Sequence, residues 1–243
     1  MKVFSDFTET HYATILRAVS KNFEVIDIGN AGIATRECLW RHDVDMSPHR
    51  AKKIAEIDLS HGVKSHFYFM FGSRFYNLFE PAVTTILREI VKMGHHVGLH
   101  FDFSGEESNR SYSIVETITK KSQLLEMLMD QSVMSFSVHD PGRVHAPELN
   151  DDRVAGMINA SSTSLMNSFS YCSDSNGRWR YRNLWDVAND PKIKRLYALT
   201  HPEWWTPDSM SARERVVRCI DGRSARVKTE YEDDLLRQGR LDD

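Results

Sequence analysis

The strongest constraint on the fold is an alternation of two kinds of segment along the chain. Short apolar runs rich in Val, Ile, Phe and Tyr are separated by longer segments with the period of an α-helix. We expect strands in the runs CLWRHDVD, VKSHFYFMF, HHVGLHF, VMSFSVH, SFSYCS and IKRLYALT. Strands that alternate with helices usually form parallel βα units. The order of segments therefore predicts an α/β fold with a mainly parallel sheet.

Helix signals occupy the segments between the predicted strands. Ser47 and Pro48 resemble an N-cap and first-turn pair at the start of a helix that ends near Gly62. Apolar residues also recur at helical spacing in EPAVTTILREIVKMG and from residue 112 to residue 130. These helices would connect successive parallel strands.

The segment from about 211 to 243 is strongly charged and has few apolar positions. This composition predicts a helix with one packed stripe and a solvated face that frays near its end, and it leaves self-association open. No Gly- or Pro-rich linker separates this segment from the rest. We therefore interpret residues 1–243 as one domain.

Composition excludes several classes of function. The net charge is -3, and no block of Lys and Arg interleaved with aromatic residues indicates nucleic-acid binding. Neither the apolar core of a signal peptide nor a run of some 18 apolar residues is present, which predicts a cytoplasmic protein without a membrane span. Cys38, Cys172 and Cys219 are too few and too distant for a disulfide framework or a Cys-rich zinc site.

Ionisable residues recur where the predicted strands end. In a parallel barrel the carboxyl ends of the strands meet on one face, and active sites are built there. The residues at these ends are Asp43, Asp45, His100, Asp102, His139, Asp174 and His201. The pattern predicts a catalytic site formed by several strands.

Five motifs in order resemble a known family. RHDVDMSPHRAKKIAEIDLSHGVKSHFYFM, GHHVGLHFD, SFSVHDPG, YCSDSNGRWR and LTHPEWW are similar to the bacterial branch of the polysaccharide deacetylase superfamily that carries an Arg-His-Asp-Val-Asp motif. The resemblance covers roughly residues 10 to 206. It implies an irregular (β/α) barrel of about seven strands, a divalent metal that is usually zinc, and removal of acyl groups, typically acetyl, from amide nitrogens of sugars.

The resemblance also implies roles for four residues. It makes Asp43 the catalytic base, Asp45 the metal-binding carboxylate, His100 a metal ligand and His201 the acid that protonates the leaving amine. Strand geometry agrees with this division, because residues two apart face the same side about 6.6 Å apart along the chain. One carboxylate can then bind the metal while the other reaches the attacking water.

The third metal ligand departs from the wider superfamily. The usual motif has a second histidine four residues after the first, and that position is Ser104 here. His96 also lies four residues from His100, but on a strand this separation is roughly 13 Å, too far for both to bind one ion. We take His139 as the third ligand, with Asp102 as the substitute. Two histidines and one carboxylate suit zinc and also non-haem iron.

Supporting roles are expected for three further residues. Arg41 would hold Asp43 ionised through charge pairing. Asp174 would pair with Arg41 or Arg178, contact substrate, or organise a turn. Trp204 would form an apolar wall for an acetyl methyl group or a sugar face, or belong to the core. A structural role is the default for six other histidines: His42, His49, His61, His66, His95 and His145.

The sequence therefore predicts a cytosolic, metal-dependent hydrolase that removes an acyl group from the amide nitrogen of a sugar or of a sugar-containing precursor. One alternative is a hydrolase of another amide or C–N bond on the same scaffold. The other is a catalytically silent barrel that binds a glycan or a partner, which the loss of the motif histidine at Ser104 would favour. A homo-oligomer is compatible with either.

Overall fold

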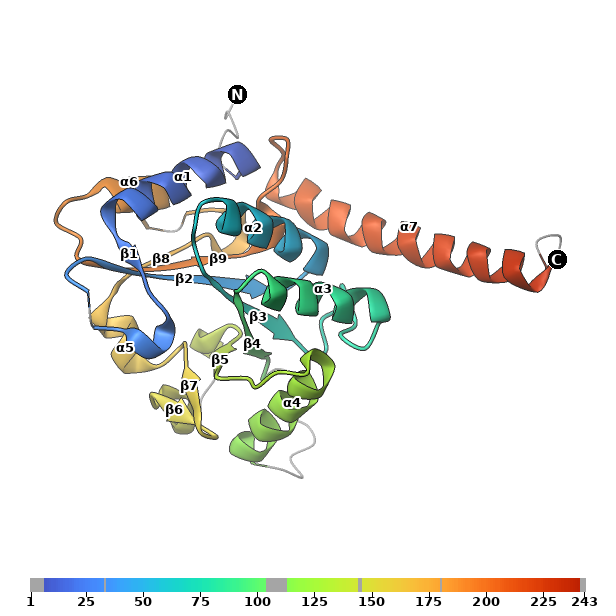
Figure 1. Ribbon diagram of the computed structural model, residues 1–243, viewed down its shortest axis with the longest axis horizontal. Helices are drawn as coiled ribbons and strands as arrows, with labels where there is room; N and C mark the ends of the chain where they lie inside the picture. The colour runs from blue at the N-terminus through green and yellow to red at the C-terminus, as the bar shows by residue number, and fades with distance from the viewer. Residues whose placement is uncertain (1–6, 33, 104–112, 144–145, 180, 241–243) are drawn as a thin grey trace.

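A curled sheet of nine strands organises the chain (Figure 1). The computed structural model describes residues 7–32, 34–103, 113–143, 146–179 and 181–240. The strands are β1 (Glu24–Val25), β2 (Glu37–Val44), β3 (His66–Met70), β4 (His96–Phe101), β5 (Ser135–Val138), β6 (Arg153–Val154), β7 (Met157–Asn159), β8 (Ser170–Ser173) and β9 (Arg195–Thr200). Their order is β6-β7-β5-β4-β3-β2-β9-β8, with β1 beside β2.

The pairing of these strands confirms the predicted fold class. The seven strands from β7 to β8 in this order are parallel to their neighbours. The short β1 is also parallel to β2, and only β6 runs antiparallel, against β7. The protein thus has the predicted α/β architecture, and its curled parallel sheet agrees with the irregular barrel of about seven strands that the resemblance implies.

Helices connect the strands and cover the outside of the sheet (Figure 1). They are α1 (Glu9–Asn22), α2 (Pro48–Ser60), α3 (Pro81–Lys92), α4 (Ile114–Met129), α5 (Thr163–Ser168), α6 (Leu184–Asn189) and α7 (Ala212–Gln238). As expected, Ser47 caps α2: its Oγ accepts a hydrogen bond from the Arg50 backbone N–H at 3.2 Å. Helix α4 begins with a capping box formed by Ser113 and Glu116.

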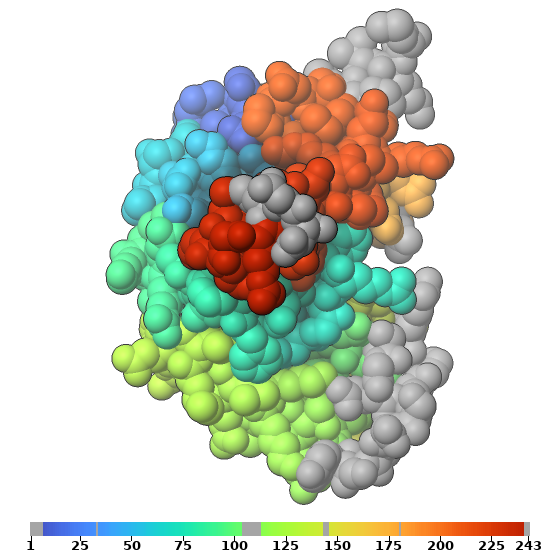
Figure 2. Space-filling view, turned by 90° about the vertical axis from the view of Figure 1, so that its right-hand side faces the viewer, coloured from blue at the N-terminus to red at the C-terminus, as the bar shows by residue number. Residues whose placement is uncertain are grey.

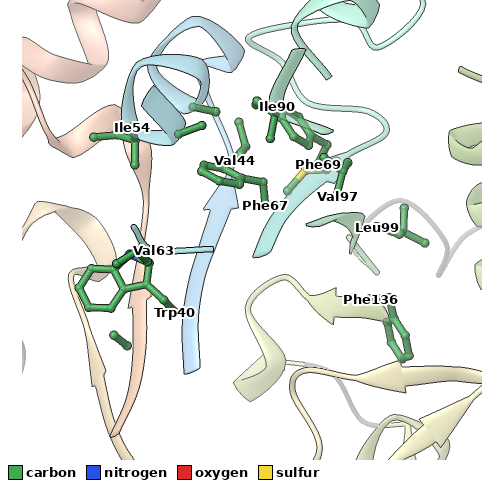
Figure 3. Close-up of a cluster of buried hydrophobic side chains, with 14 of the residues drawn as sticks. Trp40, Val44, Ile54, Val63, Phe67, Phe69, Ile90, Val97, Leu99 and Phe136 are labelled. Carbon is green, nitrogen blue, oxygen red and sulfur yellow. The ribbon is translucent and has the colours of Figure 1, made fainter. Parts of the chain in front are cut away.

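The main hydrophobic core lies between the strands and these helices. Figure 3 shows residues of β2 and β3, such as Val44 and Phe69, near Ile54 of α2 and Ile90 of α3. The strand residues labelled there are Trp40, Val44, Phe67, Phe69, Val97, Leu99 and Phe136. All of them are buried. Since side chains alternate along a strand, the intervening residues of β2 to β5 face the inside of the barrel.

Strand β2 illustrates this alternation with polar residues. His42 faces outward, where its Nδ1 lies 2.7 Å from Thr200 Oγ1 and its Nε2 lies 2.9 Å from Asp58 Oδ2. Tyr12 also donates to Asp58 at 2.6 Å. His42 therefore joins the sheet to α1 and α2, which agrees with a structural role. Asp43, the next residue, points to the inside.

The sheet curls strongly enough to bring distant strands into contact. Arg41 of β2 donates to the Ala160 carbonyl at 2.9 Å, and the Tyr197 hydroxyl of β9 donates to the same oxygen at 2.7 Å. Ala160 directly follows β7, and three strands separate β7 from β2 in the sheet. These bonds across the interior close the lower part of the barrel.

Gly98 has no side chain at a point where the Ser135 backbone and the Tyr68 ring approach β4 closely. A substitution at this position therefore tests the packing. A Cβ at this position would lie 2.5 Å from the Ser135 carbonyl oxygen and 2.6 Å from the buried Tyr68 ring. We expect Gly98→Ala to lower the free energy of unfolding by about 1–3 kcal/mol, the usual cost of overpacking. Gly222→Ala, in α7 with nothing within 4 Å, is the control and should be neutral or stabilising. Urea denaturation would measure both, and equal stability of the two variants would contradict this packing.

The C-terminal helix α7 extends away from the barrel (Figures 1 and 2). Ser211 and Glu214 form a capping box at its start, and Arg215 is its one buried residue. Arg223 and Arg226 pair with Glu80 at the start of α3. The predicted helix is present, but its packed stripe is confined to the stretch that contains Arg215, Arg223 and Arg226. Residues 241–243 lie outside the described residues. No described helix combines the length and the apolar character that crossing a membrane requires.

Candidate active site

A cavity of about 750 Å³ opens where the parallel strands end. Eight of the nine residues that the sequence assigned to the site line it: Arg41, Asp43, Asp45, His100, Asp102, His139, His201 and Trp204. The ninth, Asp174, lies behind His201. These residues belong to β2, β4 and the segments that follow β2, β4, β5, β8 and β9. They converge because the strands are parallel and the sheet is curled.

Three of these residues have the arrangement of metal ligands. Asp45, His100 and His139 each offer an atom within 4.8 Å of the others. His100 Nε2 lies 3.2 Å from Asp45 Oδ1, and His139 Nε2 lies 4.0 Å from Asp45 Oδ2. Ligand atoms around a tetrahedral zinc ion are about 3.3 Å apart when the bonds are near 2.0 Å. The three side chains therefore fit a common divalent cation after small adjustments.

The hydrogen bonds of His100 support this interpretation. Ser137 Oγ donates to Asp43 Oδ1 at 3.2 Å, so the same oxygen accepts from His100 Nδ1 at 2.7 Å. With its proton on Nδ1, a neutral His100 directs the lone pair of Nε2 at the Asp45 carboxylate. Neither His100 Nε2 nor Asp45 Oδ1 has a hydrogen-bond partner among the described residues, although both atoms are buried. A metal ion, or a proton on Nε2, between these two atoms would satisfy both of them.

Asp102 stands behind His139 in this arrangement. Its Oδ1 lies 3.5 Å from His139 Nδ1, on the side of the ring opposite to Nε2. A carboxylate at this position orients a ligating imidazole. The geometry places Asp102 at the back of His139 and outside the three-residue cluster, and Ser104 lies outside the described residues.

Asp43 is held by Arg41 through two parallel hydrogen bonds. Arg41 Nε donates to Oδ1 at 2.8 Å and Arg41 Nη2 donates to Oδ2 at 2.7 Å. Burial opposes ionisation of Asp43, but the charge of Arg41 outweighs it, so the pKa of Asp43 lies below its usual range. The predicted pairing of Arg41 with Asp43 is therefore present, and the carboxylate is ionised at neutral pH.

Asp45 is also held in its charged form. Burial would raise its pKa, yet the nearby imidazoles of His100 and His201 lower the pKa of Asp45 to well below the usual range for a carboxylic acid. Its side chain is 20% exposed, on the side of the cavity. An ionised carboxylate at the mouth of a buried cluster is suited to bind a cation.

Asp174 positions His201. Its Oδ1 lies 2.6 Å from His201 Nδ1, and its two oxygens accept from the His201 backbone N–H at 3.0 and 3.1 Å. Trp205 Nε1 also donates to Asp174, at 2.8 Å. Asp174 has no exposed surface and pairs with neither Arg41 nor Arg178 among the bonds of the described residues. Of the roles open to it, support of His201 is the one that its contacts match.

The environment of His201 favours its protonated form. Burial works against the charge, but the hydrogen bond and charge of Asp174, followed by the charge of Asp45, raise the pKa of His201 to about 10. Its Nδ1 faces Asp174, and its Nε2 lies 3.9 Å from Asp45 Oδ2 at the cavity. His201 can therefore present a proton on Nε2 to a molecule bound there.

Sequence reasoning did not identify two polar residues at this site. Ser137 links Asp43 to His100 through hydrogen bonds. The sequence feature that could have identified it is a polar residue between Phe136 and Val138 in an otherwise apolar strand. Glu203 is buried beside His201, with both carboxylate oxygens unpartnered among the described residues. Burial, then the charge of Asp45, raises the pKa of Glu203 well above its usual range, so this side chain is a neutral acid.

No protein-family model matches the sequence, and no curated protein is similar to it. Comparison with solved structures finds distant likenesses. A chitin deacetylase from the fungal pathogen Colletotrichum lindemuthianum is 11% identical with a TM-score of 0.47, over 76% of this chain and 81% of that one. A family 4 carbohydrate esterase from Bacillus anthracis is 14% identical with a TM-score of 0.45, over 87% and 86%.

A CE4 family pseudoenzyme from Bacillus anthracis is 16% identical, with a TM-score of 0.46 over 79% of this chain. The match spans 63% of the pseudoenzyme's own length. Because every one of these TM-scores is below 0.5, the likenesses assign no activity to this chain.

Proposed function

We propose that this protein is a metal-dependent hydrolase that removes an acyl group, and specifically an acetyl group, from the amide nitrogen of a sugar or of a sugar-containing intermediate. The observation that carries the proposal is the pair of buried, unpartnered acceptors, Asp45 Oδ1 and His100 Nε2, 3.2 Å apart at the base of the cavity. A base and an acid stand on either side of this pair.

Asp45, His100 and His139 would hold the metal. The donor set of two imidazoles and one carboxylate fits zinc and leaves coordination positions open on the cavity side. When bound, a divalent ion there polarises the acyl oxygen and lowers the pKa of the attacking water. Ser137 keeps the proton of His100 on Nδ1, and Asp102 faces Nδ1 of His139, so both rings direct Nε2 toward Asp45.

Asp43 and His201 would carry the two proton transfers. Asp43 is ionised and fixed by Arg41, so it accepts the proton of the attacking water. His201 is protonated and fixed by Asp174, so it donates a proton from Nε2 to the departing amine. An amine is a poor leaving group unless it is protonated, and an amide bond therefore needs both residues.

The substrate follows from the cavity and the resemblance of the sequence. The cavity is lined by a buried Trp204 and by polar side chains such as Ser173 and Asn176, a combination that suits an acyl methyl group attached to a hydroxyl-rich molecule. We place this molecule among cytoplasmic sugar precursors, linked to a nucleotide or a lipid. We treat residues 1–243 as one barrel domain with an extended helix, which is free to self-associate.

Replacing the proposed ligands should remove the metal. We expect Asp45→Ala, His100→Ala and His139→Ala each to lose one equivalent of zinc, because two remaining ligands bind an ion weakly. His61→Ala, at the end of α2, is the matched control and should keep the wild-type content. Elemental analysis of protein dialysed against zinc measures the content, and acetate release from N-acetylated sugars measures activity.

The same panel can contradict the assignment. If His139→Ala keeps the full metal content while Asp102→Ala loses an equivalent, the third ligand is Asp102. If none of the three ligand variants changes the zinc content, or if the zinc-loaded protein hydrolyses no acylated amine, the proposed activity is wrong. A barrel that only binds a glycan would give the last result together with glycan affinity.

A further inference from the structure

A second group of metal-ligating side chains lies at the opposite end of the barrel. Asp27, His66 and His96, which we call the basal cluster, each offer a ligand atom within 4.8 Å of the others. His66 and His96 are the first residues of β3 and β4 and are paired in the sheet register. His100 lies at the far end of β4, so the basal cluster and the cavity are separated by roughly 13 Å along the strand.

The basal cluster is built around one carboxylate oxygen. Asp27 Oδ2 lies 2.7 Å from His96 Nε2 and 3.5 Å from His66 Nε2. The two imidazole rings stack with their centroids 4.8 Å apart and 16° between their planes. Asp27 Oδ1 accepts from the Gly29 backbone N–H at 2.7 Å, which fixes the direction of the carboxylate. All three ligand atoms therefore point to one place.

His66 is held where its ring nitrogen can reach this place. Its Nε2 lies 3.5 Å from Asp27 Oδ2 and accepts a long hydrogen bond from the Ile28 backbone N–H at 3.4 Å. A metal ion would take the lone pair of Nε2 in exchange for that long, weak bond. The His66 side chain is 5% exposed, whereas Asp27 and His96 are 34% and 43% exposed. One ligand is thus rigid and buried, and two can adjust from the surface.

We infer that the basal cluster binds a second divalent metal ion of the borderline class, such as zinc, through one oxygen and two nitrogens. Tetrahedral zinc requires ligand atoms about 3.3 Å apart, which the Asp27–His66 distance already matches. The shorter Asp27–His96 distance has to widen by roughly 0.6 Å to reach that value, and the half-exposed His96 ring is free to move that far. Two imidazoles discriminate against Mg²⁺ and Ca²⁺, which prefer oxygen ligands.

Such an ion would fasten the base of the barrel. Asp27 lies between β1 and a short 3₁₀ turn, Ile28–Asn30, that runs beneath the sheet interior. Binding would tie this segment to the starts of β3 and β4, below the interior cluster that contains Leu39, Tyr68 and Tyr197. The inference is independent of the activity proposed for the cavity, because it uses no residue of that site.

Zinc stoichiometry tests the basal cluster. We expect wild-type protein to bind two equivalents, and His96→Ala, Asp27→Asn and His100→Ala to bind one each. The double variant His96→Ala/His100→Ala should bind none, and His61→Ala should bind two. Asp27→Asn is nearly isosteric and can still accept from Gly29, so it guards against loss of metal through misfolding. Equilibrium dialysis with Zn²⁺ as the only added metal gives these numbers.

The outcomes separate the two metal sites. If the wild type binds one equivalent that His96→Ala removes and His100→Ala does not, the basal inference stands and the proposed cavity site fails. In the His100→Ala background, zinc should raise the melting temperature, and adding Asp27→Asn should abolish that rise. If His96→Ala and Asp27→Asn both bind as much zinc as wild type, the three residues form only an ion pair and the inference is wrong.

Discussion

Asp43→Asn is expected to lower turnover on an N-acetylated sugar by about 10²–10⁴-fold while the protein keeps its metal. The amide has the shape of the carboxylate and can accept from Arg41, but it cannot take a proton from water. Asp43 is ionised in the native site because Arg41 binds both of its oxygens. The substitution therefore removes the base and leaves the ligands Asp45, His100 and His139 in place.

This experiment needs a check on folding, because Arg41 is buried and loses its charged partner. Removing one member of a buried pair typically costs about 3–5 kcal/mol, and an amide that still accepts a hydrogen bond reduces this cost. Circular dichroism and zinc content would show whether the variant is folded and loaded. Asp140→Asn, another carboxylate at the cavity wall, is the matched control and should retain most activity. Equal zinc loss in Asp43→Asn and Asp45→Asn would overturn the division between base and ligand.

The low pKa of Asp43 has a consequence for acid solutions. A base whose pKa lies below the usual carboxylate range stays ionised as the pH falls toward that range. Metal binding requires deprotonated ligands, so acid solutions weaken it. We therefore attribute the expected decline of activity on acidification to loss of metal, with Asp43 still ionised.

Much of the fold was predictable because local signals and tertiary structure agree. All eight residues of β2 are buried, as expected of a strand in a parallel sheet covered on both faces, although Glu37, Arg41, His42 and Asp43 are polar. Ser47 and Pro48 begin α2 as predicted, and Gly62 follows its last residue by two positions. Strands β6 and β7, with two and three residues, were not predicted. Segments this short contain no full period from which a strand can be recognised.

The convergence of the site residues was predictable, but their partners were not. Parallel strands bring their carboxyl ends together, which places Asp43, His100 and His201 around one cavity. Asp174, however, lies in a local sequence typical of a turn, and its partner His201 is 27 residues later. The contact depends on the register of β8 against β9, which the sequence of either strand alone does not specify.

His96 was correctly excluded from the metal ligands of the cavity, but its position in the basal cluster was not predicted. Its distance from His100 along β4 keeps it out of the cavity, as the strand spacing predicts. The same spacing places it at the opposite end of the strand. There it meets His66 because β3 and β4 pair in a register that aligns the two histidines, and Asp27 because the chain returns beneath the sheet after β1. Neither relation has a signal in the local sequence.

His201→Ala should lose turnover on amide substrates by about 10²–10⁴-fold and much less on an activated acetyl ester, with the metal retained. The departing amine must be protonated, whereas the leaving group of an activated ester departs as an anion. Since His201 gives up its proton as the pH rises through its pKa, amide hydrolysis should fall on the basic side. The pKa of about 10 reflects the charges of Asp174 and Asp45, and a cation bound at Asp45 would repel the imidazolium and lower that value.

Asp174→Asn is the matched variant for this test, because it keeps the imidazole and the hydrogen-bonded position but removes the charge that stabilises its proton. Asp174 raises the pKa of His201, so the variant should lose amide hydrolysis at a lower pH than wild type. Its pH profile on the activated ester should be unchanged on the basic side. If His201→Ala is equally impaired on amide and ester, or if Asp174→Asn leaves the basic limb in place, His201 does not protonate the amine and another group must do so.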